Sequence, residues 1–265
     1  MTTSATGRRR GRAAVGAALL LAGCGAGANG PGAPTPGATS ASSMPAVSGT
    51  PQTASSSPTT APTPGEISAT AGDPADLTVP ESASGRTRVV PVPGADTPAA
   101  EAPGHVVRYT AEVEEGLEEI AAGFPAAVRA DLTDARGWQK KDGVRFVNVS
   151  PSRHEAGVRP DIRIQFASPR LVDEVCAPMR TGGRLSCHHH GKVMINAWRW
   201  VHGAPTYGDD LANYRIYLVN HEVGHAIGHS HRSCPGKGAE APVMLQQTLR
   251  LEGCRPHPYP VPGAR

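Results

Sequence analysis

The aromatic residues of this chain are confined to its C-terminal part. The 265 residues include 11 Phe, Tyr and Trp residues, and the first of them is Tyr109. Large apolar side chains supply most of the surface that a core removes from water, so a packed core along the whole length is excluded. We therefore expect one folded domain of about 170 residues at the C-terminus, which is enough for a sizeable core.

The first 23 residues have the layout of a bacterial export signal. Residues 1–12 carry four arginines, and residues 13–23 form an apolar run that is shorter than the roughly 20 residues needed to span a bilayer. Leu21-Ala22-Gly23-Cys24 resembles the lipobox of bacterial lipoproteins. This implies that Cys24 becomes a lipidated N-terminus, which holds an exported protein at the extracytoplasmic face of the cell membrane. An ordinary secretory signal or an uncleaved anchor is the alternative.

Residues 24–104 have the composition of a disordered linker. The tract consists mainly of Ala, Gly, Ser, Thr and Pro, with 14 prolines after Cys24. It cannot bury enough apolar surface to offset its ordering entropy. We expect the folded domain to span residues 105–265, or to start at residue 86 if Arg86–Pro93 contains the first strand.

The formal charge argues against a nucleic-acid partner. The chain has 26 basic and 23 acidic residues, but four of its arginines lie in the predicted signal segment. Without that segment the formal charge is −1, from 22 basic and 23 acidic residues. Affinity for nucleic acid comes mostly from neutralising phosphates, so we expect no nucleic-acid partner.

Hydrophobic spacing predicts two helices and four strands. A helix that starts at Phe124 has Val128 and Leu132 on the same stripe. A longer helix starts near Leu211, with Asp209 or Asp210 as its N-cap. Strands are expected at His105–Glu114, Val144–Val149, Ile162–Phe166 and Lys192–Trp200. Strands flanking a helix, followed by a long C-terminal helix, indicate an α+β domain.

The cysteines that follow Cys24 are even in number: Cys176, Cys187, Cys234 and Cys254. In an oxidising compartment four cysteines can form two disulfides in three pairings. We favour Cys176–Cys187 with Cys234–Cys254, because each closes a short loop. Thiolate metal ligands are the rival interpretation, which the absence of a C-x-x-C pair disfavours.

The segment HEVGHAIGHSH, residues 221–231, carries the chemistry. On a helix His221 and His225 lie one turn apart, so both imidazoles can reach one metal ion. Gly228 can adopt the left-handed conformation that ends a helix, which lets His231 return as a third ligand. Three imidazoles leave one position open for water, as in catalytic zinc sites. Zinc lowers the pKa of that water to about 7, and Glu222 can take its proton.

Other side chains have weaker claims to function. His188-His189-His190 could hold a second metal, although such a run is more often a solvated loop. His229 could replace His231 if the chain leaves the helix differently. Tyr259 is a conceivable transition-state donor, but we do not favour it because it lies in a Pro-rich tail.

The extended motif resembles H-E-x-x-H-x-x-G-x-x-H of the metzincin zinc endopeptidases, and locally it looks closest to the matrixin form. The resemblance implies a mixed twisted sheet, an active-site helix and a small irregular C-terminal part. It makes His221, His225 and His231 the zinc ligands and Glu222 the base. Metzincins also have a methionine in a tight turn beneath the metal, the Met-turn, and Met244 is the candidate.

The resemblance has limits. Gln246 stands where matrixins commonly have Pro, and no calcium loop or cysteine-switch propeptide is evident. The lipobox, the Pro-rich tract, Cys234-Pro235-Gly236 and Ala241-Pro242-Val243-Met244 together resemble an actinobacterial domain-of-unknown-function family of exported candidate metallopeptidases.

The sequence therefore predicts a zinc-dependent endopeptidase tethered at the bacterial cell surface, with a peptide or protein substrate. Cobalt, nickel or iron could also occupy a three-histidine site. One alternative is a non-catalytic lipoprotein that binds a metal or an envelope partner on a protease-like scaffold. Another is an amidase that acts on cell-wall peptides.

Overall fold

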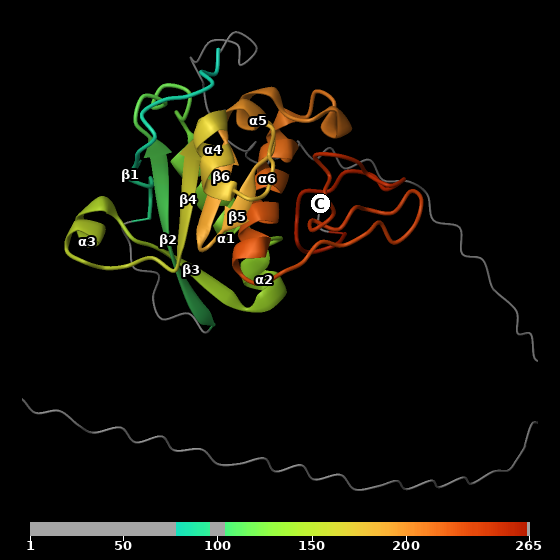
Figure 1. Ribbon diagram of the computed structural model, residues 1–265. Coiled ribbons are helices and arrows are strands. Elements are labelled where there is room, and N and C mark those ends of the chain that lie inside the picture. Colours follow the sequence, from blue (N-terminus) through green and yellow to red (C-terminus); the bar gives the residue numbers. More distant parts are fainter. Residues whose placement is uncertain (1–77, 96–103, 264–265) are drawn as a thin grey trace, which may run out of the picture. The chain divides into compact units, whose positions relative to one another are not determined.

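A computed structural model describes residues 78–95 and 104–263, all within one compact unit, Glu66–Arg265 (Figure 1). The predicted signal segment, Cys24 and the predicted linker up to residue 77 lie outside the described residues. Among the described residues, no helix is both long enough and apolar enough to cross a membrane.

A six-stranded mixed sheet forms the centre of the domain. Its strands are β1 (Thr87–Val89), β2 (His105–Glu114), β3 (Val144–Asn148), β4 (Ile162–Ala167), β5 (Cys187–His189) and β6 (Lys192–Asn196). The order is β1-β2-β4-β6-β5, and β3 pairs with β2 beside β1. β3, β4 and β6 run parallel to β2, whereas the edge strands β1 and β5 are antiparallel to their neighbours.

Helices cover both faces of the sheet near β6. They are α1 (Phe124–Thr133), α2 (Trp138–Asp142), α3 (Pro151–Glu155), α4 (Pro169–Cys176), α5 (Ala197–His202) and α6 (Leu211–Ala226), with a 3-10 turn at Pro205–Tyr207. Val193 and Ile195 belong to the main core with α1 and α6, whereas Met194 packs with α4 in a second cluster. Because successive strand residues point to opposite faces, α4 lies across the sheet from α1 and α6. The α+β fold class is confirmed.

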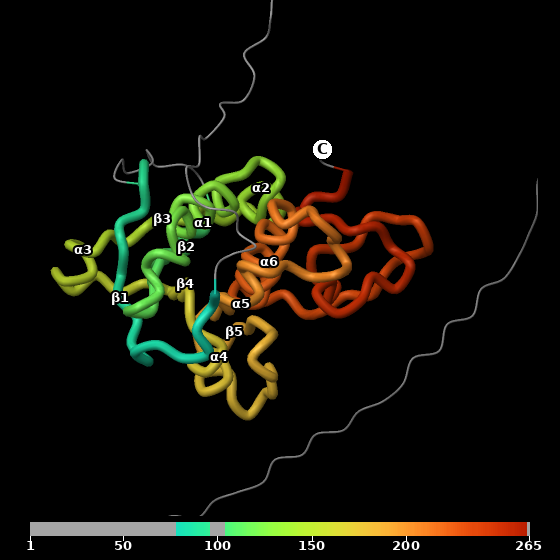
Figure 2. The backbone as a smooth tube through the Cα atoms, turned by 90° about the horizontal axis from the view of Figure 1, so that it is seen from above, coloured from blue at the N-terminus to red at the C-terminus, as the bar shows by residue number. Residues whose placement is uncertain are grey.

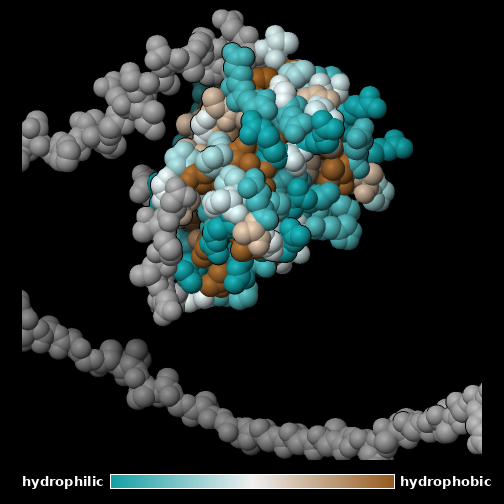
Figure 3. Space-filling view, turned by 90° about the vertical axis from the view of Figure 1, so that its left-hand side faces the viewer, coloured by the Kyte–Doolittle hydropathy of each residue, from teal (hydrophilic) through white to brown (hydrophobic). Residues whose placement is uncertain are grey.

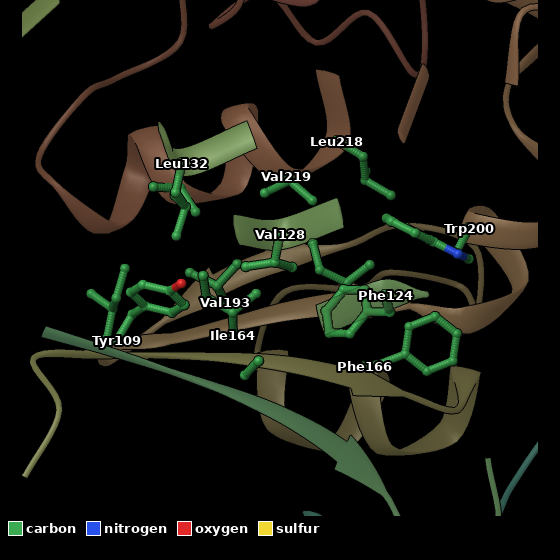
Figure 4. Close-up of a cluster of buried hydrophobic side chains, with 14 of the residues drawn as sticks. Tyr109, Phe124, Val128, Leu132, Ile164, Phe166, Val193, Trp200, Leu218 and Val219 are labelled. Carbon is green, nitrogen blue, oxygen red and sulfur yellow. The ribbon is translucent and has the colours of Figure 1, made fainter. Parts of the chain in front are cut away.

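The main core lies between the sheet and the pair α1 and α6. Phe124 of α1 lies with its ring centroid 5.1 Å from that of Phe166 and 5.2 Å from that of Trp200 (Figure 4). Val128 and Leu132, on the same stripe of α1, are fully buried as predicted. The core thus fixes α6 against the centre of the sheet.

Two of the predicted elements test the capping argument. The long helix begins at Leu211, and the Asp210 side chain accepts a hydrogen bond from the backbone N–H of Asn213 at 3.1 Å. The single strand predicted over Lys192–Trp200 is wrong beyond Asn196. The side chain of Asn196 accepts the backbone N–H of Trp198 at 2.9 Å and starts α5, so a capping residue overrides the apolar run.

The domain begins earlier than either predicted start, residue 86 or residue 105. Val79 and Ala83 pack against the main core, and the backbone N–H of Gly85 donates to Glu114 Oε1 at 2.8 Å. β1 then pairs with β2. The Ala, Ser and Thr content of this stretch resembles the tract before it, so composition did not separate a short packed segment from the linker.

Both predicted disulfides are present. Cys176–Cys187 joins the end of α4 to β5, and Cys234–Cys254 closes a loop in the C-terminal part. Residues 232–263 form that part beside α6, without a helix or a regular strand (Figure 2). The small irregular C-terminal part expected from the sequence is therefore present.

Candidate metal centre

Helix α6 carries two of the three histidines. Its first half is anchored by Tyr214 and Leu218, which are buried in the main core. His221 and His225 follow on the next turns. The helix ends at Ala226, and Gly228, at φ +102°, turns the chain back toward the helix.

This turn brings His231 to the other two histidines. One ring nitrogen from each of His221, His225 and His231 lies within 4.8 Å of the corresponding atoms of the other two. The Nε2 atoms of His225 and His231 are 3.0 Å apart. The three predicted ligands therefore converge on one point.

Backbone carbonyls orient two of these rings. His221 Nδ1 donates to the Val243 carbonyl oxygen at 2.8 Å, and His225 Nδ1 donates to the His229 carbonyl oxygen at 2.9 Å. Because each Nδ1 carries the proton, each Nε2 presents a lone pair. This pattern of a donated ring N–H is typical of histidines that bind metal.

Burial favours the neutral form of all three imidazoles. It lowers the pKa of His221 to about 3, and it also lowers the pKa of His225 and of His231. Neutral imidazole is the form that binds a cation. Three neutral nitrogens with an open side fit Zn²⁺, for which three protein ligands and one free position are usual in catalytic sites.

A cavity of about 310 Å³, here called the metal cleft, opens onto these nitrogens. Its wall includes all three histidines, Glu222 and Tyr217. Burial raises the pKa of Glu222 to about 8. A divalent cation beside this carboxyl group would favour the ionised form, which can accept a proton.

Two exposed apolar side chains lie at the rim of the metal cleft. Met179 and Leu249 line the cleft, with 48% and 50% of their surfaces exposed. Among the described residues they are the exposed large hydrophobic side chains. Apolar side chains left open to water at the mouth of a cavity are typical of a surface that receives a ligand.

Met244 lies directly beneath the histidine turn of α6. A Cβ atom at Gly224 would be 2.5 Å from Met244 Sδ and 2.6 Å from Trp138 Cζ2, so only glycine fits there. The preceding residue, Val243, supplies the carbonyl that holds His221. The loop that carries Met244 is thus packed against the helix at the level of His221 and His225.

His229, the alternative third ligand, points elsewhere. Its Nε2 is 2.6 Å from Asp142 Oδ2, and its ring stacks on Trp138 with centroids 4.2 Å apart. His229 contributes its carbonyl oxygen, which orients His225. Sequence reasoning missed Trp138 and Asp142 because they lie more than 80 residues away along the chain, with no local signal.

The other candidate residues from the sequence, His188–His190 and Tyr259, differ in where they lie relative to the metal cleft. His188 lines the metal cleft, where its Nε2 accepts the backbone N–H of Gly191 at 3.2 Å. Within the described part of the chain, the one cluster with three metal-binding groups is the site on α6, so a second site at residues 188–190 is not formed. Tyr259 lies under the guanidinium of Arg136, 3.8 Å from the ring centroid, and is not part of the cleft wall.

Gln247 holds the loop below the cleft and was not expected from the sequence. It is fully buried, and its Nε2 donates to the carbonyl oxygens of Pro242 and His257. Its Oε1 accepts from the Tyr207 hydroxyl at 2.9 Å. A lone Gln in an irregular segment has no pattern that would have distinguished it from a surface residue.

Fold and site together define an α+β domain with a candidate three-histidine metal centre. Residues 73–257 match the family described as "Protein of unknown function (DUF3152)", and the chain belongs to this family. The matched region begins ahead of residue 78, in keeping with the early start of the folded domain. No curated protein and no solved structure matches the chain.

Proposed function

We propose that this domain is a zinc-dependent endopeptidase. The observation that carries the proposal is the convergence of His221, His225 and His231 beside Glu222, at the floor of an open cleft. A site for metal storage would not need a carboxyl group at this position.

The three histidines would hold the ion through their Nε2 atoms. A bound Zn²⁺ supplies Lewis-acid chemistry, which polarises a carbonyl group and makes water nucleophilic at neutral pH. His221 and His225 are already fixed by their bonds to Val243 and His229. The site therefore needs little reorganisation to accept the ion.

Glu222 would handle the proton. Water that attacks a peptide carbonyl must lose a proton, and the Glu222 carboxylate is the acidic side chain in the cleft wall that can accept it. The same oxygen can then return the proton to the leaving amine. This direction of transfer needs the ionised carboxylate at the start of the cycle.

The substrate class rests on two lines of support. The apolar rim at Met179 and Leu249 suits a substrate with apolar side chains. The extended histidine motif resembles that of metzincin endopeptidases, and the packing of Met244 against Gly224 supports Met244 as the Met-turn residue. Together they favour cleavage of peptides.

We also propose that the domain acts outside the cytoplasm, anchored through Cys24. The two disulfides support an oxidising compartment. Lipidation would place the metal cleft at the extracytoplasmic face of the membrane, within reach of envelope proteins.

Glu222→Ala in the full chain tests the proposal. Wild type, Glu222→Ala and the exposed-carboxylate control Glu174→Gln are incubated with a peptide library, and zinc is measured in each. We expect wild type and Glu174→Gln to cleave, and Glu222→Ala to retain zinc but lose cleavage by about 10²–10⁴-fold. Zinc-loaded wild type that cleaves neither peptides nor purified cell wall would favour a non-catalytic binder. Cleavage of wall peptides alone would favour an amidase.

A further inference from the structure

A second and larger cavity, about 550 Å³ in volume, lies away from the metal cleft. It is found at the edge of the sheet where β1 and β3 adjoin β2, whereas the metal cleft includes residues of β5 at the opposite edge. Ligand binding in one cavity therefore need not obstruct the other.

The cavity arises from a split in the sheet edge. The Tyr109 carbonyl accepts the N–H of Val149 after β3, and the Ala111 carbonyl accepts the N–H of Val90 after β1. Because alternate carbonyls of a strand face the same way, both segments lie on one side of β2. Beyond these two hydrogen bonds the segment after β1 and the segment after β3 separate. The wall of the cavity includes one residue from each, Ala95 after β1 and Ser150 after β3.

Four arginines from four elements line this cavity, which we call the arginine cavity: Arg108 of β2, Arg129 of α1, Arg145 of β3 and Arg153 of α3. No Asp or Glu belongs to its described wall. The four arginines make the described wall of the cavity positively charged. Figure 3 shows that hydrophilic residues dominate the side of the domain on which β1 and α3 lie.

The sheet register places two of these charges together. Val106 pairs with Arg145 and Arg108 pairs with Val147, so Arg108 and Arg145 point to the same face on neighbouring strands. Such diagonal positions are about 7–8 Å apart, close enough for long side chains to interact. Two guanidinium groups in this arrangement can both contact one anion between them.

Arg129 is held toward the same cavity. Its guanidinium carbon is 3.4 Å from the position that a Cβ of Gly94 would take, so the side chain lies against the backbone there. Its charge also lowers the pKa of Tyr109, which opposes the larger effect of burial. The approach to Gly94 places the guanidinium beside the cavity wall, and the effect on Tyr109 is consistent with this position.

Arg108 has an acidic partner within the protein. Asp161 lies 3.9 Å from the Arg108 guanidinium, and both side chains are about half exposed, so this ion pair is weak. A hollow lined by charges of one sign concentrates the field and attracts an oppositely charged ligand. A single carboxylate would neutralise one charge, whereas a phosphate carries up to two and matches the arginine fork.

We propose that the arginine cavity binds a phosphate-bearing ligand. The cavity is independent of the proposed peptidase activity, because none of its residues lies in the metal cleft. The phosphate could belong to a free small molecule or to a lipid headgroup, and the experiment separates these sources.

The test is a titration of the full chain with inorganic phosphate, with and without zinc, followed by isothermal calorimetry. Arg153→Gln removes an exposed charge without disturbing the core, and Arg129→Gln removes a partly buried one. Arg170→Gln is the matched control, since Arg170 is 70% exposed on α4 and pairs with Glu174 outside the cavity. Binding to phosphatidylglycerol and phosphatidylcholine vesicles is measured with the same proteins.

We expect each cavity variant to weaken phosphate binding by about tenfold, and Arg170→Gln to leave it unchanged. Arginine-dependent binding to phosphatidylglycerol vesicles but not to free phosphate would identify a headgroup as the source. Equal binding by all variants, or binding to neither phosphate nor phosphatidylglycerol, would overturn the proposal. Arginine-dependent binding of polyglutamate alone would replace phosphate by an acidic peptide.

Discussion

The two cavities of this domain lie at opposite edges of one sheet and are built differently. In the metal cleft, the rings of His221 and His225 are fixed by backbone carbonyls. In the arginine cavity, Arg108 and Arg153 are exposed, and the acid that pairs with Arg108 is half exposed as well. A fixed set of nitrogens suits an ion that demands geometry, whereas long charged side chains suit an anion captured by its charge.

The largest effect should come from removing a metal ligand. His225→Ala takes away one of three nitrogens, so we expect zinc content and peptide cleavage to fall to background. Phosphate binding should stay at the wild-type value, because the arginine cavity shares no residue with the metal cleft. Metal analysis and calorimetry on one preparation measure both. A variant that keeps its zinc would show that the three histidines are not the ligands.

Gly224→Ala tests whether the cleft depends on close packing beneath it. The new methyl group would overlap Met244 and Trp138, and such overpacking costs about 1–3 kcal/mol. We expect a lower unfolding midpoint in denaturant and a reduced zinc affinity. Gly236→Ala is the control, since a Cβ there meets no atom within 4 Å. Equal stability of the two variants would contradict the packing described here.

Asp142→Asn tests the hydrogen bonds that support the proposed metal ligands. Asp142 holds the ring of His229, and the His229 carbonyl in turn orients His225. Outer partners of this kind typically affect metal affinity by 10–100-fold. Because Asp142 acts through the backbone of His229, we expect an effect at the low end of this range. Zinc binding in a competition assay should be about tenfold weaker. Asp209→Asn, an exposed residue before α6, should have no effect.

The smallest effect should come from the apolar rim. Leu249 is half exposed, so contact with a substrate would bury part of one side chain, worth about 1 kcal/mol. We expect Leu249→Ala to raise KM by about fivefold on peptides with apolar side chains and to leave kcat unchanged. A fall in kcat with unchanged KM would assign Leu249 to the chemistry instead of to substrate contact.

Local patterns predicted the parts of this domain that depend on neighbouring residues. The helical spacing from His221 to His231, with Gly228 as the turn, was sufficient to predict that the three histidines converge. The boundaries of β2 and the start of α6 also follow from alternation and capping. In contrast, the strand predicted over Lys192–Trp200 ended early, because one side-chain cap outweighs the apolar run.

The rest of the site depends on contacts between distant segments. Trp138 donates its indole N–H to the carbonyl of Asn220, 82 residues away, and Gln247 joins loops through bonds that span 5 to 41 residues. The arginine cavity is also non-local, because its four arginines come from four separate elements. Hydrophobic periodicity indicates which face of its helix or strand a residue lies on. It does not indicate which distant residue packs against that face.

The Cys176–Cys187 bridge bears on how the protein matures. It closes the loop 177–186, and that loop supplies Met179, Leu185 and Ser186 to the wall of the metal cleft. The three histidines belong to a different segment, residues 221–231. While the two thiols are reduced, this part of the cleft wall would lack its covalent link to β5. If the domain is the peptidase proposed above, its substrate-binding surface would be complete only in an oxidising compartment.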